Sequence, residues 1–232
     1  MTYRLHYAPD NASLIIRLAL EELGQPYETL LVERARNAQQ SAAYLALNPN
    51  GLIPTLETPH GAVFETGAIL LWLCDTHAKL APAPDSAARG DFLKWLFFTS
   101  NTLHSELRML FYPAKYIGEA PAEQAALRLG LQKSLAAHLQ KLDRLAREGH
   151  PWFAAPTPSA LDLYVVTLLR WLALYPKDGA RWFSLSDTPH LYRLASQVEC
   201  RASVQAAIKA EGLGPTPFTQ PTYATPPEGS AT

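Results

Sequence analysis

The hydrophobic pattern of the first eighty residues changes between the two-residue period of strands and the longer period of helices. Alternation predicts strands at 3–7, 27–32, 55–58 and 62–64, and helical spacing predicts helices at 14–23, 41–47 and 66–77. Gly24 ends the first helix, and residues 59–61 (Pro-His-Gly) form the turn of a hairpin. The predicted order is βαβαββα, in which a helix joins the first two strands and makes them parallel.

The second half of the chain shows no strand pattern. Helical spacing recurs at 88–112, 121–147, 159–175, 189–199 and 203–211. We therefore expect an α/β domain over 1–79, a linker over 80–88 and an all-helical domain over 89–214. The tail, 215–232, has five prolines in eighteen residues and is expected to lie over the surface or to be disordered.

Composition narrows the class of partner. With 20 basic and 21 acidic residues the formal charge is -1, which gives no electrostatic reason to expect nucleic acid or a membrane surface. The two cysteines, Cys74 within a predicted helix and Cys200 directly after one, form no Cys-x-x-Cys pattern, so we expect no disulfide framework and a reducing cytoplasm. The histidines lack metal-ligand spacing, and charged residues interrupt the longest apolar stretch; no metal site and no membrane span are expected.

The stretch "NPNGLIPTL" places Pro54 at the entrance of the third predicted strand. An X-Pro peptide bond can be cis, because its trans preference is only about 0.5 to 1 kcal/mol. With a cis bond, the N–H and C=O of Ile53 would point away from the sheet and could pair with an extended peptide. The alternative is a proline that only begins a strand.

Glu65 and Thr66 follow the hairpin and precede a helix. Thr66 stands at the expected N-cap, where free amides and a hydroxyl could hold a carboxylate. Glu65 beside it would suit an ammonium group, so the pair matches the zwitterionic head of an amino acid. The alternative is that Thr66 only caps its own helix.

Several motifs in this order resemble the cytosolic glutathione transferases. They are the βαβαββα order, "NPNGLIPTL", "ETGAILLWL" as a variant of the family pattern, and the all-helical second half; together they extend over residues 3–212. The resemblance implies a thioredoxin-like N-terminal domain followed by an all-α domain. Ser159 and Asp162 have the spacing of a capping box and are expected to be structural, as in the family.

The resemblance also implies glutathione as co-substrate. Glu65 and Thr66 would then hold its γ-glutamyl head, and the backbone of Ile53, before Pro54, would pair with its cysteinyl unit. The family commonly has Lys or Gln at the position of Leu52, so one polar contact is missing here. Affinity is therefore expected to be weaker, or the glycine end to be held differently.

Transfer chemistry requires a thiolate, and the family places the donor that stabilises it between the first strand and the first helix. The stretch "YAPDNASL" is similar to the bacterial beta-class pattern, with Ala12 in place of the characteristic cysteine. Ser13 is the favoured donor, Asn11 the second and Tyr7 the third. The alternatives are helix capping for Ser13 and Asn11, and core packing for Tyr7.

The helical domain would supply the electrophile's side of the site. In "TLHSELRMLFYP", His104 matches a beta-class histidine that projects into the active site, although a lone helical histidine is often only packed. Arg108 and Tyr112 share its helical face and would line the cleft. Aromatic residues wrap this helix on more than one face, and with the resemblance they predict a homodimer.

The function expected from these features is transfer of the thiol of glutathione to small hydrophobic electrophiles. Peroxide reduction and ether cleavage with glutathione remain alternatives within the enzyme class. A non-catalytic binding or regulatory protein is the alternative outside it, because Ala12 and Leu52 replace customary polar residues.

Overall fold

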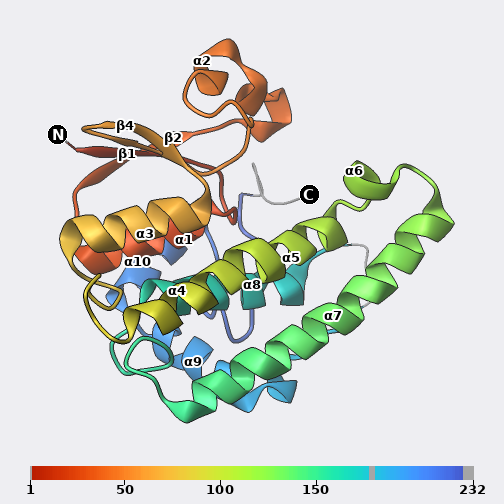
Figure 1. Ribbon diagram of the computed structural model, residues 1–232. Helices are drawn as coiled ribbons and strands as arrows, with labels where there is room; N and C mark the ends of the chain where they lie inside the picture. Colours follow the sequence, from red (N-terminus) through yellow and green to blue (C-terminus); the bar gives the residue numbers. More distant parts are fainter. Residues whose placement is uncertain (1, 178–180, 227–232) are drawn as a thin grey trace.

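The N-terminal part of the computed structural model is built on a four-stranded sheet of order β2-β1-β3-β4 (Figure 1). The structure describes residues 2–177 and 181–226. The sheet contains β1 (Tyr3–Tyr7), β2 (Tyr27–Leu31), β3 (Thr55–Thr58) and β4 (Gly61–Phe64). Strand β1 is parallel to β2 and antiparallel to β3, and β3 and β4 form a hairpin. The predicted βαβαββα order is confirmed.

Two helices, α1 (Ser13–Leu23) and α3 (Thr66–His77), lie between the sheet and the helical part (Figure 1). Helix α1 ends at Gly24, whose φ of 66° is readily adopted only by glycine. The connection from β2 to β3, residues 32–54, is long and irregular. It contains η1 (Arg34–Arg36), η2 (Ala38–Gln40) and α2 (Ala42–Leu45), so the helix predicted at 41–47 is a single turn capped by Ser41.

The helical part follows from residue 89. Its elements are α4 (Arg89–Phe98), η3 (Thr99–Leu103), α5 (His104–Phe111), α6 (Ala114–Ile117), α7 (Pro121–Glu148), α8 (Ala160–Leu174), η4 (Leu185–Asp187), α9 (Pro189–Glu199) and α10 (Ala202–Glu211). Helix α8 is apolar on all sides and nearly every residue in it is buried, which makes it the centre of this part. The predicted thioredoxin-like and all-α fold class is confirmed.

The helix predicted at 88–112 is present over 89–111, but it is not α-helical throughout. A π-helical turn, Thr99–Leu103, separates α4 from α5. One extra residue in a turn changes the direction of the side chains that follow it, and such turns occur frequently at functional sites. A hydrophobic period cannot reveal this insertion, because the apolar positions on both sides of it are still compatible with one helix.

A capping box begins α8, as the sequence predicts. The Ser159 hydroxyl accepts from the Asp162 N–H (3.3 Å), and the Asp162 carboxylate accepts from the N–H groups of Ser159 (2.7 Å) and Ala154 (2.8 Å). Burial raises the pKa of Asp162 to about 6 although these bonds act against the shift. The geometry agrees with a structural role, in which the carboxylate fixes both the helix start and the preceding loop.

One hydrophobic core joins the two parts, because α1 packs against α3 on one side and against α8 and α10 on the other. The segment after α10 adds to this core. Phe218 and Ala224 are buried, and the Arg170 guanidinium donates to backbone C=O groups of this segment at Leu213, Pro217 and Thr222. Residues 215–226 therefore lie over the surface of the protein, the first of the two expectations for the tail, while 227–232 lie outside the described residues.

Within the described residues, no helix combines the length and the apolar character needed to cross a bilayer. The same residues contain no group of three or more His, Cys, Asp or Glu side chains placed to hold a metal ion.

Candidate active site

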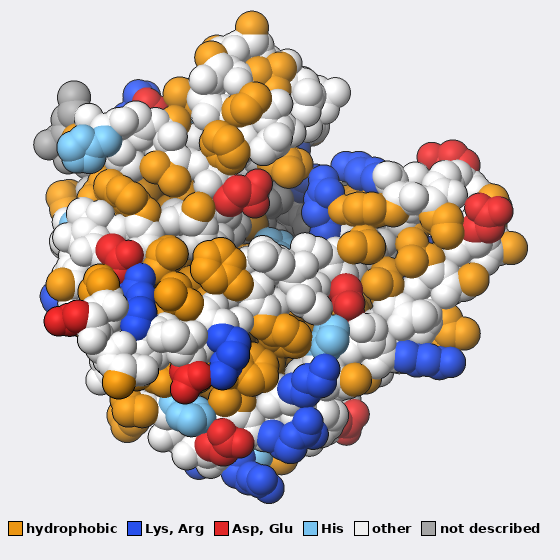
Figure 2. Space-filling view, viewed as in Figure 1, with side chains coloured by type: hydrophobic (Ala, Val, Ile, Leu, Met, Phe, Trp, Pro, Cys, Tyr) orange, Lys and Arg blue, Asp and Glu red, His pale blue; other side chains and the backbone are white. Residues whose placement is uncertain are grey.

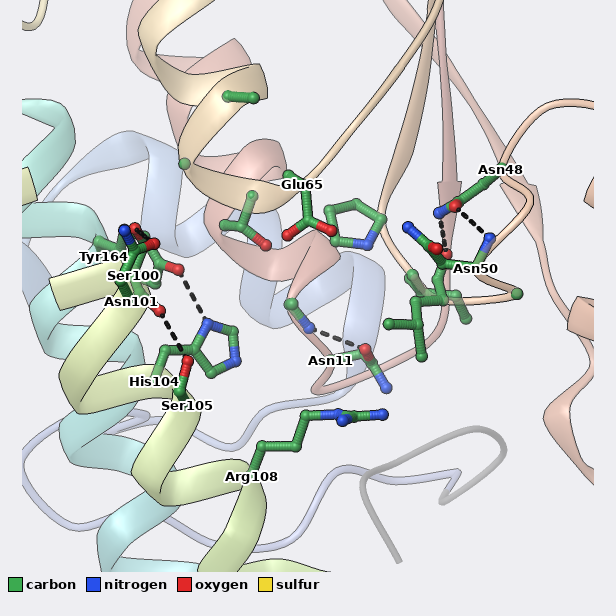
Figure 3. A pocket seen from close by; sticks show the side chains of 18 of the residues that line it. Asn11, Asn48, Asn50, Glu65, Ser100, Asn101, His104, Ser105, Arg108 and Tyr164 are labelled. Atoms are coloured by element: carbon green, nitrogen blue, oxygen red, sulfur yellow. Dashed lines mark hydrogen bonds between the residues drawn. The ribbon is translucent and has the colours of Figure 1, made fainter. Parts of the chain in front are cut away.

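A cleft of about 1220 Å³ opens between the N-terminal part and helices α4, α5 and α8 (Figure 2). Eight of the ten predicted site residues line it: Asn11, Ile53, Pro54, Glu65, Thr66, His104, Arg108 and Tyr112. Ser13 and Tyr7 do not. Residues from four separate stretches of the chain thus share one space, and the two parts of the protein form opposite walls (Figure 3).

The loop before β3 presents main-chain groups to the cleft. The Ile53–Pro54 peptide bond is cis, in agreement with the ligand-binding interpretation of the sequence. The loop is fixed from behind, where the Tyr44 hydroxyl (2.7 Å) and the Asn48 amide (2.8 Å) both donate to the C=O of Leu52. Within the described residues, the N–H and C=O of Ile53 have no hydrogen-bond partner. This edge can accept an extended peptide.

The start of α3 forms the next section of this wall. The N-cap is Glu65, and Thr66 is the first helical residue, so the expected N-cap role of Thr66 is wrong. No side chain caps the helix, which leaves its first amides available to an anion. Glu65 has φ of 70° and ψ of 118°, a conformation that costs a non-glycine residue about 1 to 3 kcal/mol. Backbone strain of this kind concentrates at ligand sites.

Tyr164 connects the two walls. Its hydroxyl lies 2.8 Å from Nδ1 of His104, on the helical wall. Burial and then the charge of Glu65 raise the pKa of Tyr164, so its phenol stays neutral. Tyr164 therefore contacts the histidine on α5 and lies close enough to the start of α3 to sense the charge of Glu65.

His104 is the first residue after the π-helical turn and contacts Trp171 as well as Tyr164. Burial, and then the positive charge of Arg108, lower the pKa of His104 to about 4. The imidazole is therefore neutral near pH 7. Figure 3 shows its ring turned toward the open space that separates it from Asn11.

Asn11 reaches the cleft from the loop between β1 and α1. Its side-chain oxygen accepts from the Ala12 N–H (2.9 Å), so the amide nitrogen points away from this bond and into the cavity (Figure 3). Asn11 is thus a hydrogen-bond donor placed at the mouth of α1, opposite the Ile53 edge.

Ser13 lies two residues further along the chain and is completely buried. Its hydroxyl donates to the Ala8 C=O (3.1 Å) and accepts from the Ala8 N–H (3.3 Å), which closes the loop on itself. Tyr7 is partly buried, with the Arg17 guanidinium 4.9 Å from its ring centroid. Neither side chain lines the cleft, so the geometry does not bring the favoured donor, Ser13, to the site.

The helical wall carries Arg108 and Tyr112, as expected from their spacing after His104. The Arg108 guanidinium donates to the Tyr116 hydroxyl, and the Lys115 ammonium lies 4.8 Å from the ring centroid of Tyr112. These contacts hold both cations near the cleft without neutralising either charge.

Several residues that line the cleft were not predicted from the sequence. Tyr164 and Trp171 lie in a helix whose apolar pattern predicts only core, and Arg34 and Lys115 lie in short irregular segments. A signal existed on the first long helix, where the polar residues Ser100, Asn101, His104 and Ser105 interrupt an apolar stretch. All four line the cleft.

A buried ion pair fixes the donor loop to the helical part. Asp10 is fully buried, has φ of 52°, and accepts two hydrogen bonds from Arg170 at 2.8 and 3.0 Å. Its carboxylate also accepts from Trp171 Nε1 and from the Tyr175 hydroxyl, each at 2.9 Å. Because Asp10 directly precedes Asn11, this pair sets where the donor lies relative to the helical wall.

Comparison with known proteins agrees with this architecture, a thioredoxin-like domain joined to an all-helical domain. Residues 12–76 match the family model described as "Glutathione S-transferase, N-terminal domain". The chain is 30% identical over 218 residues to the glutathione S-transferase GST-4.5 of Xanthomonas campestris, covering 90% of this chain and 99% of that protein. The chain belongs to the glutathione S-transferase family.

Two further relatives align with this chain over nearly their whole length. Glutathione S-transferase GstA of Escherichia coli O157:H7 is 28% identical over 216 residues, covering 90% of this chain and 99% of that protein. A sphingomonad glutathione S-transferase, solved in complex with glutathione, is 29% identical with a TM-score of 0.74 and covers 91% of this chain and all of that one. Both parts of the fold are therefore common to the relatives.

Proposed function

We propose that this protein binds glutathione in the cleft and transfers its thiol to small electrophiles. The observation that carries the proposal is the Ile53 main-chain edge lying on the same wall as the uncapped start of α3 at Thr66. A tripeptide with an amino-acid head and an extended centre fits this pair of features. The glutathione bound to the sphingomonad relative supports the same ligand.

In this arrangement the γ-glutamyl carboxylate binds the first amides of α3 and the Thr66 hydroxyl, and its ammonium group binds Glu65. The cysteinyl unit pairs with Ile53 beside Pro54. The sulfur then faces the mouth of α1, where Asn11 lies.

Activation of the thiol requires its pKa to fall from about 8.5 to near 7, which is about 2 kcal/mol. A helix N-terminus supplies about 0.3 to 1 kcal/mol, and a hydrogen bond to a charged group supplies about 1.5 to 3 kcal/mol. A side-chain donor is therefore needed. We assign this role to the Asn11 amide rather than to Ser13, because Asn11 lines the cleft and Ser13 does not.

The transfer step is a nucleophilic substitution. The thiol gives its proton to water, the thiolate attacks the electrophilic carbon, a carbon–sulfur bond forms, and the leaving group departs with its electron pair. Neutral His104, Tyr112 and Trp171 would form the surface against which the electrophile's apolar body packs.

We further propose that the protein is a cytoplasmic homodimer that removes reactive compounds. Hydrophobic side chains gather on the surface beside the cleft, over α3 and α4 (Figure 2). Phe97 in α4 is 47% exposed, and Leu71 and Trp72 of α3 are only partly buried. An apolar surface of this kind suits a second copy. Sedimentation velocity tests it, with Phe97→Asp expected to shift a dimer to monomer.

The thiol pKa of bound glutathione tests the catalytic proposal. Thiolate absorbance is measured against pH with saturating wild type, Asn11→Ala and Ser13→Ala. Wild type should lower the thiol pKa by about 1.5 units, and Asn11→Ala should return it toward 8.5. Ser13→Ala should keep most of the shift.

Two outcomes would contradict this assignment. Loss of the shift in Ser13→Ala, but not in Asn11→Ala, would make Ser13 the donor. Binding of glutathione by wild type without any fall in the thiol pKa would favour the non-catalytic binding protein, which the apolar residues Ala12 and Leu52 at the cleft make the second candidate.

A further inference from the structure

One end of the cleft is lined by three cations. Arg34 comes from η1, Arg108 from α5 and Lys115 from α6, and we name these three residues the cationic end. The acidic residues among the described cleft-lining residues are Glu65 and Asp75. Asp75 accepts two hydrogen bonds from Arg89 (2.8 and 2.9 Å), so its charge is already paired.

The three charges act on one another. Burial, followed by the positive charges of Arg108 and Arg34, lowers the pKa of Lys115. Like charges brought together from separate elements repel, and an anion bound between them removes that repulsion. Figure 3 shows the Arg108 side chain extending below Asn11, on the side of the cavity away from Glu65.

Two of these cations contact tyrosine rings. Arg108 donates to the hydroxyl of Tyr116 and lies 5.7 Å from its ring centroid, and Lys115 lies 4.8 Å from the ring centroid of Tyr112. Aromatic contacts orient a cation but leave its charge intact. The donors of the guanidinium fork also match the geometry of a carboxylate.

The surface next to the cationic end is largely uncharged. Phe111, Tyr112 and Trp171 line the cleft there, and His104 is neutral at pH 7. An electrophile that fills this space therefore meets an apolar surface on its body and positive charge at one end.

We propose that the cationic end selects electrophiles that carry a carboxylate, and that Arg108 and Lys115 bind this group. The ligand class is an aromatic or unsaturated acid, and the proposal rests on the proposed transferase function. Arg108 and Lys115 lie on the helical wall, across the cleft from the Ile53 edge that would hold the peptide. The other source of a carboxylate is the glycine end of glutathione, and Arg34, on the N-terminal wall, is the cation that we assign to it.

Equilibrium binding of reaction products separates these sources. The probes are the dinitrophenyl conjugate of glutathione, the same conjugate with a carboxyl group on the ring, and both conjugates rebuilt on γ-glutamylcysteine, which lacks glycine. Affinities are measured by calorimetry for wild type, Arg108→Gln, Lys115→Gln and the control Lys133→Gln, an exposed position on α7 away from the cleft.

Wild type should bind the carboxylated conjugate at least about 10-fold more tightly than the plain one, as expected for one charge-assisted hydrogen bond. High salt should reduce this ratio. Arg108→Gln and Lys115→Gln should each lower it by about 5-fold or more, with or without glycine in the probe, and Lys133→Gln should keep it.

Three outcomes would overturn the inference. Equal affinity of wild type for the plain and carboxylated conjugates removes the selectivity itself. Arg108→Gln and Lys115→Gln could instead weaken the binding of the plain and the carboxylated conjugates equally, and only when the probe contains glycine. That result would assign these residues to the glycine carboxylate of glutathione. Failure of wild type to bind glutathione or any conjugate overturns the proposed function, and the inference with it.

Discussion

The two walls of the cleft present different chemical groups. The N-terminal wall presents backbone groups, at Ile53 and at the start of α3, together with the small side chains of Asn11 and Thr66. The helical wall presents long side chains, among them His104 and Arg108. Binding by backbone groups depends on the local conformation of the chain, and most side-chain substitutions leave those groups in place. The helical wall can therefore change its chemistry while the N-terminal wall stays the same.

The buried pair of Asp10 and Arg170 connects the two walls. Asp10→Ala should lower the free energy of unfolding by about 3 to 5 kcal/mol, because it leaves the buried Arg170 guanidinium without its carboxylate. Urea denaturation measures the change. The control is Asp91→Ala, which removes an exposed ion pair with Lys94 and should have no measurable effect. Similar behaviour of the two variants would show that the buried pair does not hold the walls together.

Thr66→Val tests the N-terminal wall alone. It removes a hydroxyl from the proposed head-group site, and should weaken glutathione binding by about 1.5 to 3 kcal/mol. Calorimetry measures the affinity. The control is Thr58→Val, in the hairpin at the far end of β3, which should bind like wild type. An unchanged affinity in Thr66→Val would show that this hydroxyl does not contribute to glutathione binding.

His104→Phe tests the helical wall through pH. The pKa of His104 is about 4 in the folded protein and near 6.5 when unfolded, so the unfolded chain binds more protons between these values. Stability should fall as pH is lowered from 6.5 toward 4, by at most about 1.4 kcal/mol for each pH unit. In His104→Phe this fall should be smaller, as measured by urea denaturation from pH 7 to pH 5. His60→Phe, in the exposed turn of the hairpin, serves as control and should keep the wild-type slope; equal slopes in all three proteins would contradict the prediction.

The smallest effect concerns how closely the walls approach. A Cβ at Gly67 would lie 3.3 Å from the Cβ and Oγ of Ser100, across the cleft, whereas one at Gly130 in α7 would meet nothing within 4 Å. Gly130→Ala should stabilise its helix by about 0.5 to 1 kcal/mol. Gly67→Ala should gain less, because Ser100 must shift. Thermal unfolding compares them, and an equal gain would show that the approach of the walls is looser than this distance indicates.

The residues of the site could not all be predicted equally well from the sequence, because local conformation fixes the direction of the backbone but not that of every side chain. Ile53, Pro54, Glu65 and Thr66 lie in short motifs whose local conformation fixes where their backbone points, and they line the cleft as expected. For Ser13 the residue type suited a donor, but a hydroxyl can bond in many directions, and here it bonds to Ala8. Tyr164 could not be found, because a tyrosine in an apolar helix usually belongs to the core.

Local patterns in the chain were enough to predict the order of elements, the parallel first pair of strands, the cap of α8 and the family, because hydrophobic period and turn residues act over short range. The folded protein was needed to show the π-helical turn before His104, the direction of Ser13, the Asp10–Arg170 pair and the gathering of Arg34, Arg108 and Lys115. Each of these depends on contacts between residues far apart in the chain, or on one added residue in a helix, which no local pattern records.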